Sequence, residues 1–123
     1  MIALEDLKVY QIAMEIGEDV WALVNTWSYF EKDTLGKQIT RSADSIALNI
    51  AEGYGRYHFK ENQNFCYYAR GSIMETKTAL QKANARNLIT EEQFIVISNK
   101  QILLHKLLNA YIKSIGTSSD NDQ

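Results

Sequence analysis

The sequence has 123 residues, of which 46% are hydrophobic and 23% charged, and its formal net charge is −2. This composition is typical of one soluble globular domain that buries a core without disulfides, and the small net charge argues against a strong general affinity for nucleic acid. Proline is absent, which favours long helices because a proline inside a helix costs about 3 kcal/mol.

The number of cysteines and the hydropathy of the sequence indicate in which cellular compartment the protein is expected. The single cysteine, Cys66, excludes an internal disulfide and fits a reducing environment. No charged and then apolar leader opens the sequence, and no apolar run approaches the roughly 20 residues that span a bilayer. We therefore expect a cytoplasmic protein without a membrane-bound part.

The first predicted helix covers residues 4–29. Apolar side chains recur along it at helical spacing in two neighbouring stripes. The first stripe is Leu7, Tyr10, Met14, Gly17, Trp21 and Val24, and the second is Ile12, Ile16, Val20, Leu23, Trp27 and Phe30. Together they cover an arc of roughly 200°, wider than a surface helix of a monomeric bundle needs. We interpret the excess as an interface with further copies of the chain.

The second predicted helix begins after the polar connection 31–34, with Asp33 or Thr34 as its N-cap, and ends near Tyr54. Its apolar stripe is narrow and is flanked by alanines, which favours close packing against neighbouring helices. We expect Gly53 and Gly55 to end this helix in the left-handed conformation that glycine accepts.

The third predicted helix covers residues 59–85, with an inner face rich in small residues, and His58 stands at its N-cap position. Asn87 is a plausible left-handed residue at its end. Thr90 and Gln93 have the spacing of a capping box that starts a fourth helix, which reaches about residue 115.

The fourth predicted helix has its core face on one side, and Val96, Leu103 and Leu107 widen that face as in the first helix. Gly116 is expected to stop it. Four long helices with short loops predict an all-α, antiparallel up-down-up-down four-helix bundle over residues 1–116. The remaining segment, 117–123, has no apolar residue and is expected to be disordered.

A stripe of polar side chains runs along one side of the second predicted helix. It consists of Arg41, Ser45, Asn49 and Glu52, with Arg56 one turn further on. One interpretation is a hydrogen-bond network between helices or between subunits that includes Glu75, which would determine register and partner choice. The other is a binding site on a rigid helix.

Basic and aromatic residues alternate around the predicted turn between the second and third helices. Single-stranded RNA is bound by this combination, through phosphate contacts and base stacking. The residues of the cluster that we expect to be free for such contacts are Arg56, Tyr57, Lys60, Tyr67 and Arg70, together with Tyr54. The alternative is that these aromatic rings pack in the core and that the cations face acidic helices.

The distribution of charge leaves the same alternatives open. Residues 1–33 carry two lysines against seven acidic residues, a net charge of −5, whereas residues 34–90 carry eight cations against four acidic residues, a net charge of +4. Either the helices pair through complementary surfaces, or the basic middle of the chain faces RNA or another acidic partner.

No catalytic, metal or cofactor set emerges from the spacing of polar residues. Di-iron bundles need Glu-x-x-His on two helices, and neither His58 nor His105 has an acidic residue three positions before it. Gly53-x-Gly55 follows no predicted strand and precedes no phosphate-binding lysine. Cys66 has no positioned histidine and is expected to fill space. We therefore expect a non-enzymatic protein without a cofactor.

Two strings resemble a known family. Residues 41–56 (RSADSIALNIAEGYGR) resemble R-S-A-x-S-I-x-x-N-I-A-E-G-x-G-R, and residues 69–75 (ARGSIME) resemble A-x-G-S-x-x-E. These are signatures of the four-helix bundle proteins encoded in intervening sequences of bacterial 23S rRNA genes, sometimes labelled S23 ribosomal proteins. The resemblance covers residues 4–116. That family usually has Ser or Thr where His58 stands.

The resemblance implies a homo-pentamer and a non-enzymatic, RNA-associated or adaptor role linked to the 23S rRNA intervening sequence. The family is similar to the accessory variability protein of diversity-generating retroelements, which implies a reverse transcriptase-like partner and nucleic acid as further expectations. The alternative function is a structural or protein-interaction scaffold without any role in nucleic-acid binding.

Overall fold

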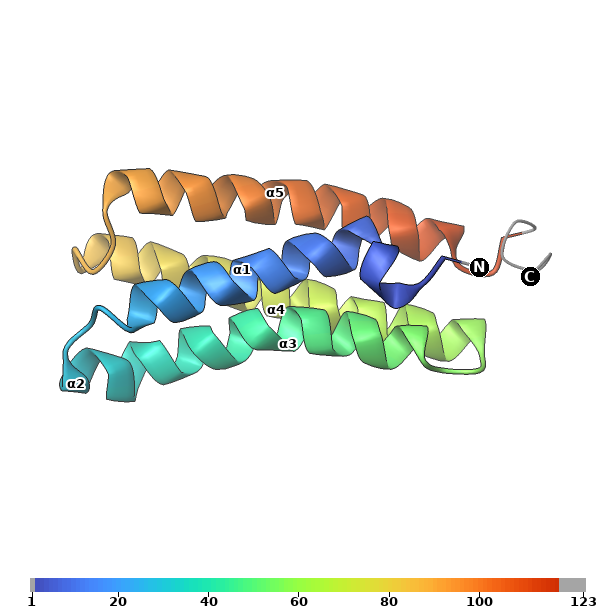
Figure 1. Cartoon of the computed structure of the whole chain (residues 1–123), viewed down its shortest axis with the longest axis horizontal. Coiled ribbons are helices and arrows are strands. Elements are labelled where there is room, and N and C mark those ends of the chain that lie inside the picture. Colours follow the sequence, from blue (N-terminus) through green and yellow to red (C-terminus); the bar gives the residue numbers. More distant parts are fainter. Residues whose placement is uncertain (1, 118–123) are drawn as a thin grey trace.

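The computed structural model describes residues 2–117, which form four long helices lying side by side along one axis (Figure 1). The long helices are α1 (Lys8–Val24), α3 (Lys37–Tyr54), α4 (Phe59–Ala85) and α5 (Glu91–Ser114). Three short segments accompany the long helices: the 3-10 turn η1 (Leu4–Asp6) precedes α1, and α2 (Tyr29–Glu31) and the π-helical turn η2 (Lys32–Gly36) lie between α1 and α3. Within residues 2–117 there is no strand, so the all-α prediction is confirmed.

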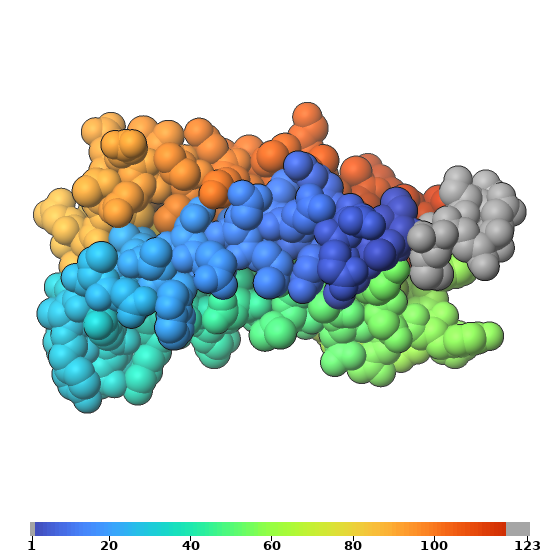
Figure 2. Space-filling model, viewed as in Figure 1, coloured from blue at the N-terminus to red at the C-terminus, as the bar shows by residue number. Residues whose placement is uncertain are grey.

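Each long helix packs against two others. α1 contacts α3 and α5, α4 also contacts α3 and α5, and the α3–α4 contact is the most extensive. One core runs through the middle, with Ile16, Ile46, Ile73 and Leu104 fully buried, one from each helix. Figure 2 shows the face on which α1 lies between α5 above and α3 below. The helical arrangement is therefore the one expected of a bundle with a single core.

The buried face of α1 is narrower than the two predicted stripes. Ile12, Ile16 and Val20 are buried as predicted, but Met14 is 44% and Trp21 56% exposed. The rest of the first stripe contacts the core, since Gly17 is buried and Leu7, Tyr10 and Val24 are partly buried against it, with α3 approaching α1 beside Gly17.

The second helical segment begins earlier than predicted, and the proposed N-cap at Asp33 or Thr34 is wrong. Ser28 is the cap: its Oγ accepts a hydrogen bond from the backbone N–H of Glu31 at 3.3 Å, and the Glu31 carboxylate accepts one from the N–H of Ser28 at 2.9 Å. This reciprocal capping box satisfies two amides that would otherwise lack partners. The first helix consequently stops at Val24 instead of residue 29.

Neither Gly53 nor Gly55 adopts the predicted left-handed conformation. Gly55 has φ −79°, and within residues 2–117 the only glycine with positive φ is Gly116, at 83°. Gly53 is needed for a different reason, since a Cβ there would lie 2.7 Å from Oδ1 of Asn62 and 2.9 Å from Cβ of Phe65. It permits the close approach of α3 and α4.

The signals at the ends of α4 and α5 are confirmed. Asn87 has φ 59°, and the N–H of Leu88 donates to the carbonyl of Ala83 at 2.9 Å, which closes α4. His58 caps α4 without a side-chain hydrogen bond. Gly116 follows the end of α5, as predicted. Of the tail predicted to be disordered, residues 118–123 lie outside the described residues.

Replacing Thr90 by alanine should lower the free energy of unfolding by about 1 kcal/mol. The Thr90 Oγ1 accepts from the N–H of Gln93 at 3.1 Å, and the Gln93 side chain accepts from the N–H of Thr90 at 3.0 Å. Urea unfolding measures the change, and Thr90→Ser, which keeps the acceptor, should restore most of the stability. An alanine variant as stable as the parent would contradict the capping role.

Apolar side chains remain exposed on α5. Val96 and Leu103, which were predicted to widen its core face, are each 45% exposed, and Ile95 and Ile102 are also exposed.

Among the described residues, no helix is long and apolar enough to cross a membrane.

Candidate functional site

The polar side chains between α3 and α4 form a seam of hydroxyl groups, here called the α3–α4 seam. Thr76 Oγ1 and Ser42 Oγ are 2.9 Å apart, and Ser45 Oγ and Ser72 Oγ are 2.6 Å apart. Ser42 and Thr76 are fully buried. Ser45 was expected in such a network, but Ser42, Ser72 and Thr76 were not. Their signal in the sequence is the presence of small hydroxyl residues on faces otherwise built from alanine.

The predicted link between Arg41 and Glu75 exists: Nη2 of Arg41 lies 2.5 Å from Oε2 of Glu75. Both side chains are exposed, so this pair contributes at most about 1 kcal/mol. Asn49 donates to the carbonyl of Ser45 in its own helix at 2.9 Å, and among residues 2–117 it has no hydrogen bond to α4. The predicted network is therefore real between Arg41, Ser45 and their partners on α4, and does not extend across the helices at Asn49.

Arg56 holds the turn between α3 and α4. Its guanidinium lies 3.6 Å from the carboxylates of both Glu52 and Glu61 and 4.8 Å from the ring centroid of Phe65. Glu52, predicted in the polar stripe, thus pairs within the turn. Tyr57 is 91% exposed and contacts the His58 ring edge-on at 4.9 Å.

Arg70 and Tyr67 lie elsewhere, on the side of α4 that faces α5. Nη1 of Arg70 donates to Oδ1 of Asn109 at 2.9 Å, and the guanidinium lies 5.1 Å from the centroid of the Tyr67 ring. Together with Ile112 and Lys113 of α5 they line an open groove of about 490 Å³, here called the α4–α5 groove. Sequence reasoning missed Asn109 and Lys113.

Lys60 lies in the first turn of α4, directly after the turn that links α3 and α4. It precedes Tyr67 by seven residues on α4, about two turns, so the two side chains lie on one face of the helix. Lys60 is exposed. The five predicted contact residues therefore do not form one site: Arg56 and Tyr57 lie in the turn, Lys60 lies at the start of α4, and Tyr67 and Arg70 lie where α4 faces α5.

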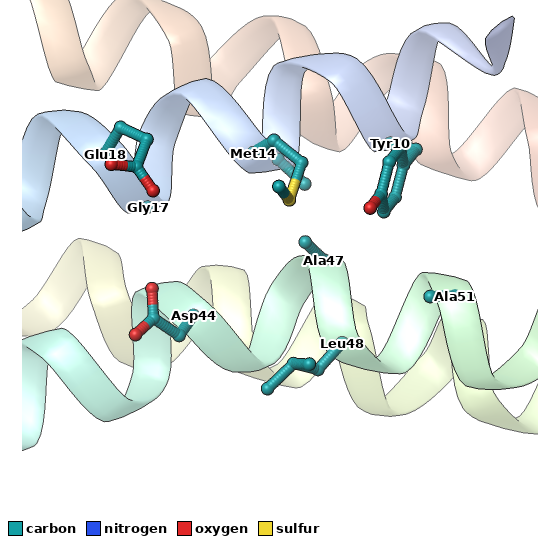
Figure 3. Close-up of a pocket in the computed structure, with 9 residues that line it drawn as sticks. Tyr10, Met14, Gly17, Glu18, Asp44, Ala47, Leu48 and Ala51 are labelled. Atoms are coloured by element: carbon teal, nitrogen blue, oxygen red, sulfur yellow. The ribbon is translucent and has the colours of Figure 1, made fainter. Parts of the chain in front are cut away.

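A second groove, here called the α1–α3 groove, lies between α1 and α3 and was not predicted (Figure 3). Its volume is about 270 Å³. Its lining is mainly apolar, with two acidic residues: Tyr10, Ala13, Met14, Gly17, Glu18, Asp44, Ala47, Leu48 and Ala51. The Cβ of any residue replacing Gly17 would lie 3.0 Å from Oδ1 of Asp44, so this glycine makes room for the carboxylate.

The charge of the α1–α3 groove is not balanced within residues 2–117. Partial burial and, to a smaller extent, the nearby Glu18 raise the pKa of Asp44. The described part of the chain holds no salt bridge to Glu18 or to Asp44. The groove thus combines exposed apolar surface with a local excess of negative charge.

The one cysteine of the sequence, Cys66, is a side chain of reactive type. Cys66 is fully buried, and burial raises the pKa of its thiol to about 11, so it is a neutral thiol near pH 7. Among residues 2–117, no three His, Cys, Asp or Glu side chains are grouped as a metal site would require.

Comparison with known proteins agrees with this architecture. No curated protein matches the chain. A solved structure of a protein of unknown function from the S23 ribosomal protein family of Bacteroides thetaiotaomicron VPI-5482 is similar, with a TM-score of 0.77 and 27% identity over 85% of this chain and 98% of that one. The pattern of the 23S rRNA-intervening sequence protein family matches residues 5–110, which is most of the length, and the chain therefore belongs to that family.

Proposed function

We propose that this chain is a non-enzymatic, cytoplasmic, RNA-associated protein that works as a homo-oligomer of antiparallel four-helix bundles. The RNA would be bound on the outer side of α4 and α5. The family is named after the 23S rRNA intervening sequence, and ribosomal RNA is therefore the first nucleic acid to test.

The α4–α5 groove is the observation that carries the proposal. It places the Arg70 guanidinium beside the Tyr67 ring, with Lys113 on the facing helix and Lys60 two turns away on α4. Cations can contact phosphates while an exposed ring stacks on an unpaired base. Arg70 donates a 2.9 Å hydrogen bond to Asn109, which orients the guanidinium, so this cation is already positioned in the protein without RNA.

Assembly is supported by the exposed apolar side chains on α1, α3 and α5. Trp21 and Leu48 are 56% and 68% exposed, and four aliphatic residues of α5 are at least 45% exposed. Contiguous exposed apolar surface on a soluble protein indicates a protein interface. The resemblance to the family implies five copies.

A scaffold without RNA binding is the second candidate, and two observations favour it. The net charge is −2, and Arg70 already has two partners within the chain. A protein whose cations serve only the bundle would bind its partners through apolar surface alone.

Binding of labelled single-stranded 23S rRNA fragments across a salt series distinguishes the two candidates. Lys60→Ala and Lys113→Ala should each lower the slope of log affinity against log salt by about 0.7, the value expected when a single strand has one phosphate fewer neutralised by the protein. Tyr67→Ala should weaken binding by about 1–3 kcal/mol, because a base would no longer stack on the ring.

Arg56→Ala is the matched control, because it removes one positive charge from the turn, where Glu52 and Glu61 hold the side chain. It should leave RNA affinity nearly unchanged. No binding by the parent protein at low salt would reject the RNA proposal in favour of the scaffold. Equal reductions in affinity for Arg56→Ala and Lys113→Ala would show that RNA does not bind in the α4–α5 groove.

A further inference from the structure

The exposed surface of α5 forms a ridge, here called the α5 ridge. It consists of Ile95, Val96, Ile102 and Leu103, which are 48%, 45%, 68% and 45% exposed. The two pairs are seven residues apart, about two helical turns, so they line one outward side of α5. The exposed Asn99 lies between the two pairs, and the four aliphatic side chains on either side of it are left open by the described part of the chain.

One cation completes the α5 ridge. Lys106 is exposed and lies one turn beyond Ile102 and Leu103. Among residues 2–117 no salt bridge involves it. The ridge therefore presents aliphatic side chains followed, after one turn, by a positive charge without an acidic partner in that range.

The α1–α3 groove has the complementary pattern. Met14 precedes Glu18 by four residues on α1, and Leu48 follows Asp44 by four residues on α3. On both helices, the exposed apolar side chain lies one turn from the carboxylate, and Figure 3 shows Met14 and Leu48 on the two helices of the groove with both acidic residues at the same end. The spacing between apolar and charged groups is the same as on the α5 ridge.

We infer that the α5 ridge of one copy docks into the α1–α3 groove of a second copy. In this contact Ile102 and Leu103 lie against Met14 and Leu48, and the ammonium group of Lys106 lies between the carboxylates of Glu18 and Asp44. The inference rests on the proposed homo-oligomer and specifies its interface. It covers exposed apolar surface on both partners and balances two acidic groups that residues 2–117 of a single copy leave without a cation.

The two surfaces belong to different parts of the bundle. The groove is lined by α1 and α3 and the ridge by α5, and they share no residue. Such a contact is heterologous, with each copy using its ridge toward one neighbour and its groove toward the other. Repetition of this contact produces a ring if the rotation closes.

Charge reversal tests the inference in the full chain. Glu18→Lys together with Asp44→Lys should weaken association at least tenfold, and Lys106→Glu alone should do the same, because each places like charges at the contact. Combining all three substitutions in one chain should restore association to within about threefold of the parent. Sedimentation equilibrium gives the association constants, and circular dichroism verifies that each variant keeps its helices.

Glu5→Lys with Asp6→Lys is the matched control, since it changes net charge equally but lies in η1, outside the groove. It should leave association unchanged. If the parent associates and the groove variant associates equally well, this pairing of surfaces is wrong while the homo-oligomer stands. If the triple variant stays dissociated, the pairing is also wrong. A parent that is monomeric at about 100 µM, far above the dissociation constant of a stable subunit contact, would overturn both the pairing and the homo-oligomer.

Discussion

Replacing Trp27 by alanine should lower the free energy of unfolding by about 3–5 kcal/mol, the cost of removing a large buried aromatic side chain. Trp27 is 6% exposed and lies in the connection after α1. Its Nε1 donates to the carbonyl of Leu88 at 2.9 Å, in the loop between α4 and α5. The side chain therefore joins two connections that are 61 residues apart in the sequence, and its removal leaves both a cavity and an unpaired carbonyl.

Urea unfolding followed by circular dichroism measures the effect, and two variants act as controls. Trp27→Phe keeps an aromatic ring but loses the hydrogen bond, so it should cost less than the alanine variant, about 1–3 kcal/mol. Trp21→Ala removes the same chemical group from an exposed position, and should change stability by about 0.5 kcal/mol or less at concentrations where copies do not associate. Equal destabilisation at positions 21 and 27 would contradict the assigned role.

Replacing Gly53 by alanine should cost about 1–3 kcal/mol, because the added methyl group overpacks the contact between α3 and α4. That methyl group would lie 2.9 Å from Cβ of Phe65 and 3.0 Å from the backbone oxygen of Asn62. Both belong to α4, so the helices would have to separate.

Gly71→Ala is the control for the Gly53 substitution. Gly71 lies inside α4, and a Cβ there would have no neighbour within 4 Å. Alanine should therefore stabilise the protein by about 0.5–1 kcal/mol through helix propensity alone. Thermal unfolding of both variants compares the effects. A Gly53→Ala variant that is also stabilised would show that α3 and α4 can accept a methyl group at residue 53 without overpacking.

The surface predictions were partly correct, for a reason that particular residues show. The pairing of Arg41 with Glu75 and the contact of Ser45 with α4 could be inferred because a polar stripe on one helix must face a neighbour. The separation of Arg56 from Arg70 could not. Both belong to one basic and aromatic stretch, but the direction in which α4 leaves the turn directs one toward Glu52 and Glu61 and the other toward Asn109.

The sequence by itself determined the elements whose signals are local. The bounds of α4 at residues 59–85 and the left-handed Asn87 agree with the prediction, as does the Thr90 capping box, because each depends on side chains within a few residues of one another. The Ser28 capping box carried a local signal too, in Ser-x-x-Glu, and was missed.

Only the tertiary structure decided which apolar side chains are core and which are surface. Met14 and Ile16 are both hydrophobic, yet Ile16 is fully buried and Met14 is 44% exposed. The need for glycine at position 53 also depends on tertiary structure, because α4 approaches α3 there. The hydrogen bond of Trp27 does too, since its partner is 61 residues away in the sequence. Helical periodicity reports the angle at which a side chain leaves its own axis, whereas burial depends on where the neighbouring axes lie, and that position is a property of the whole chain.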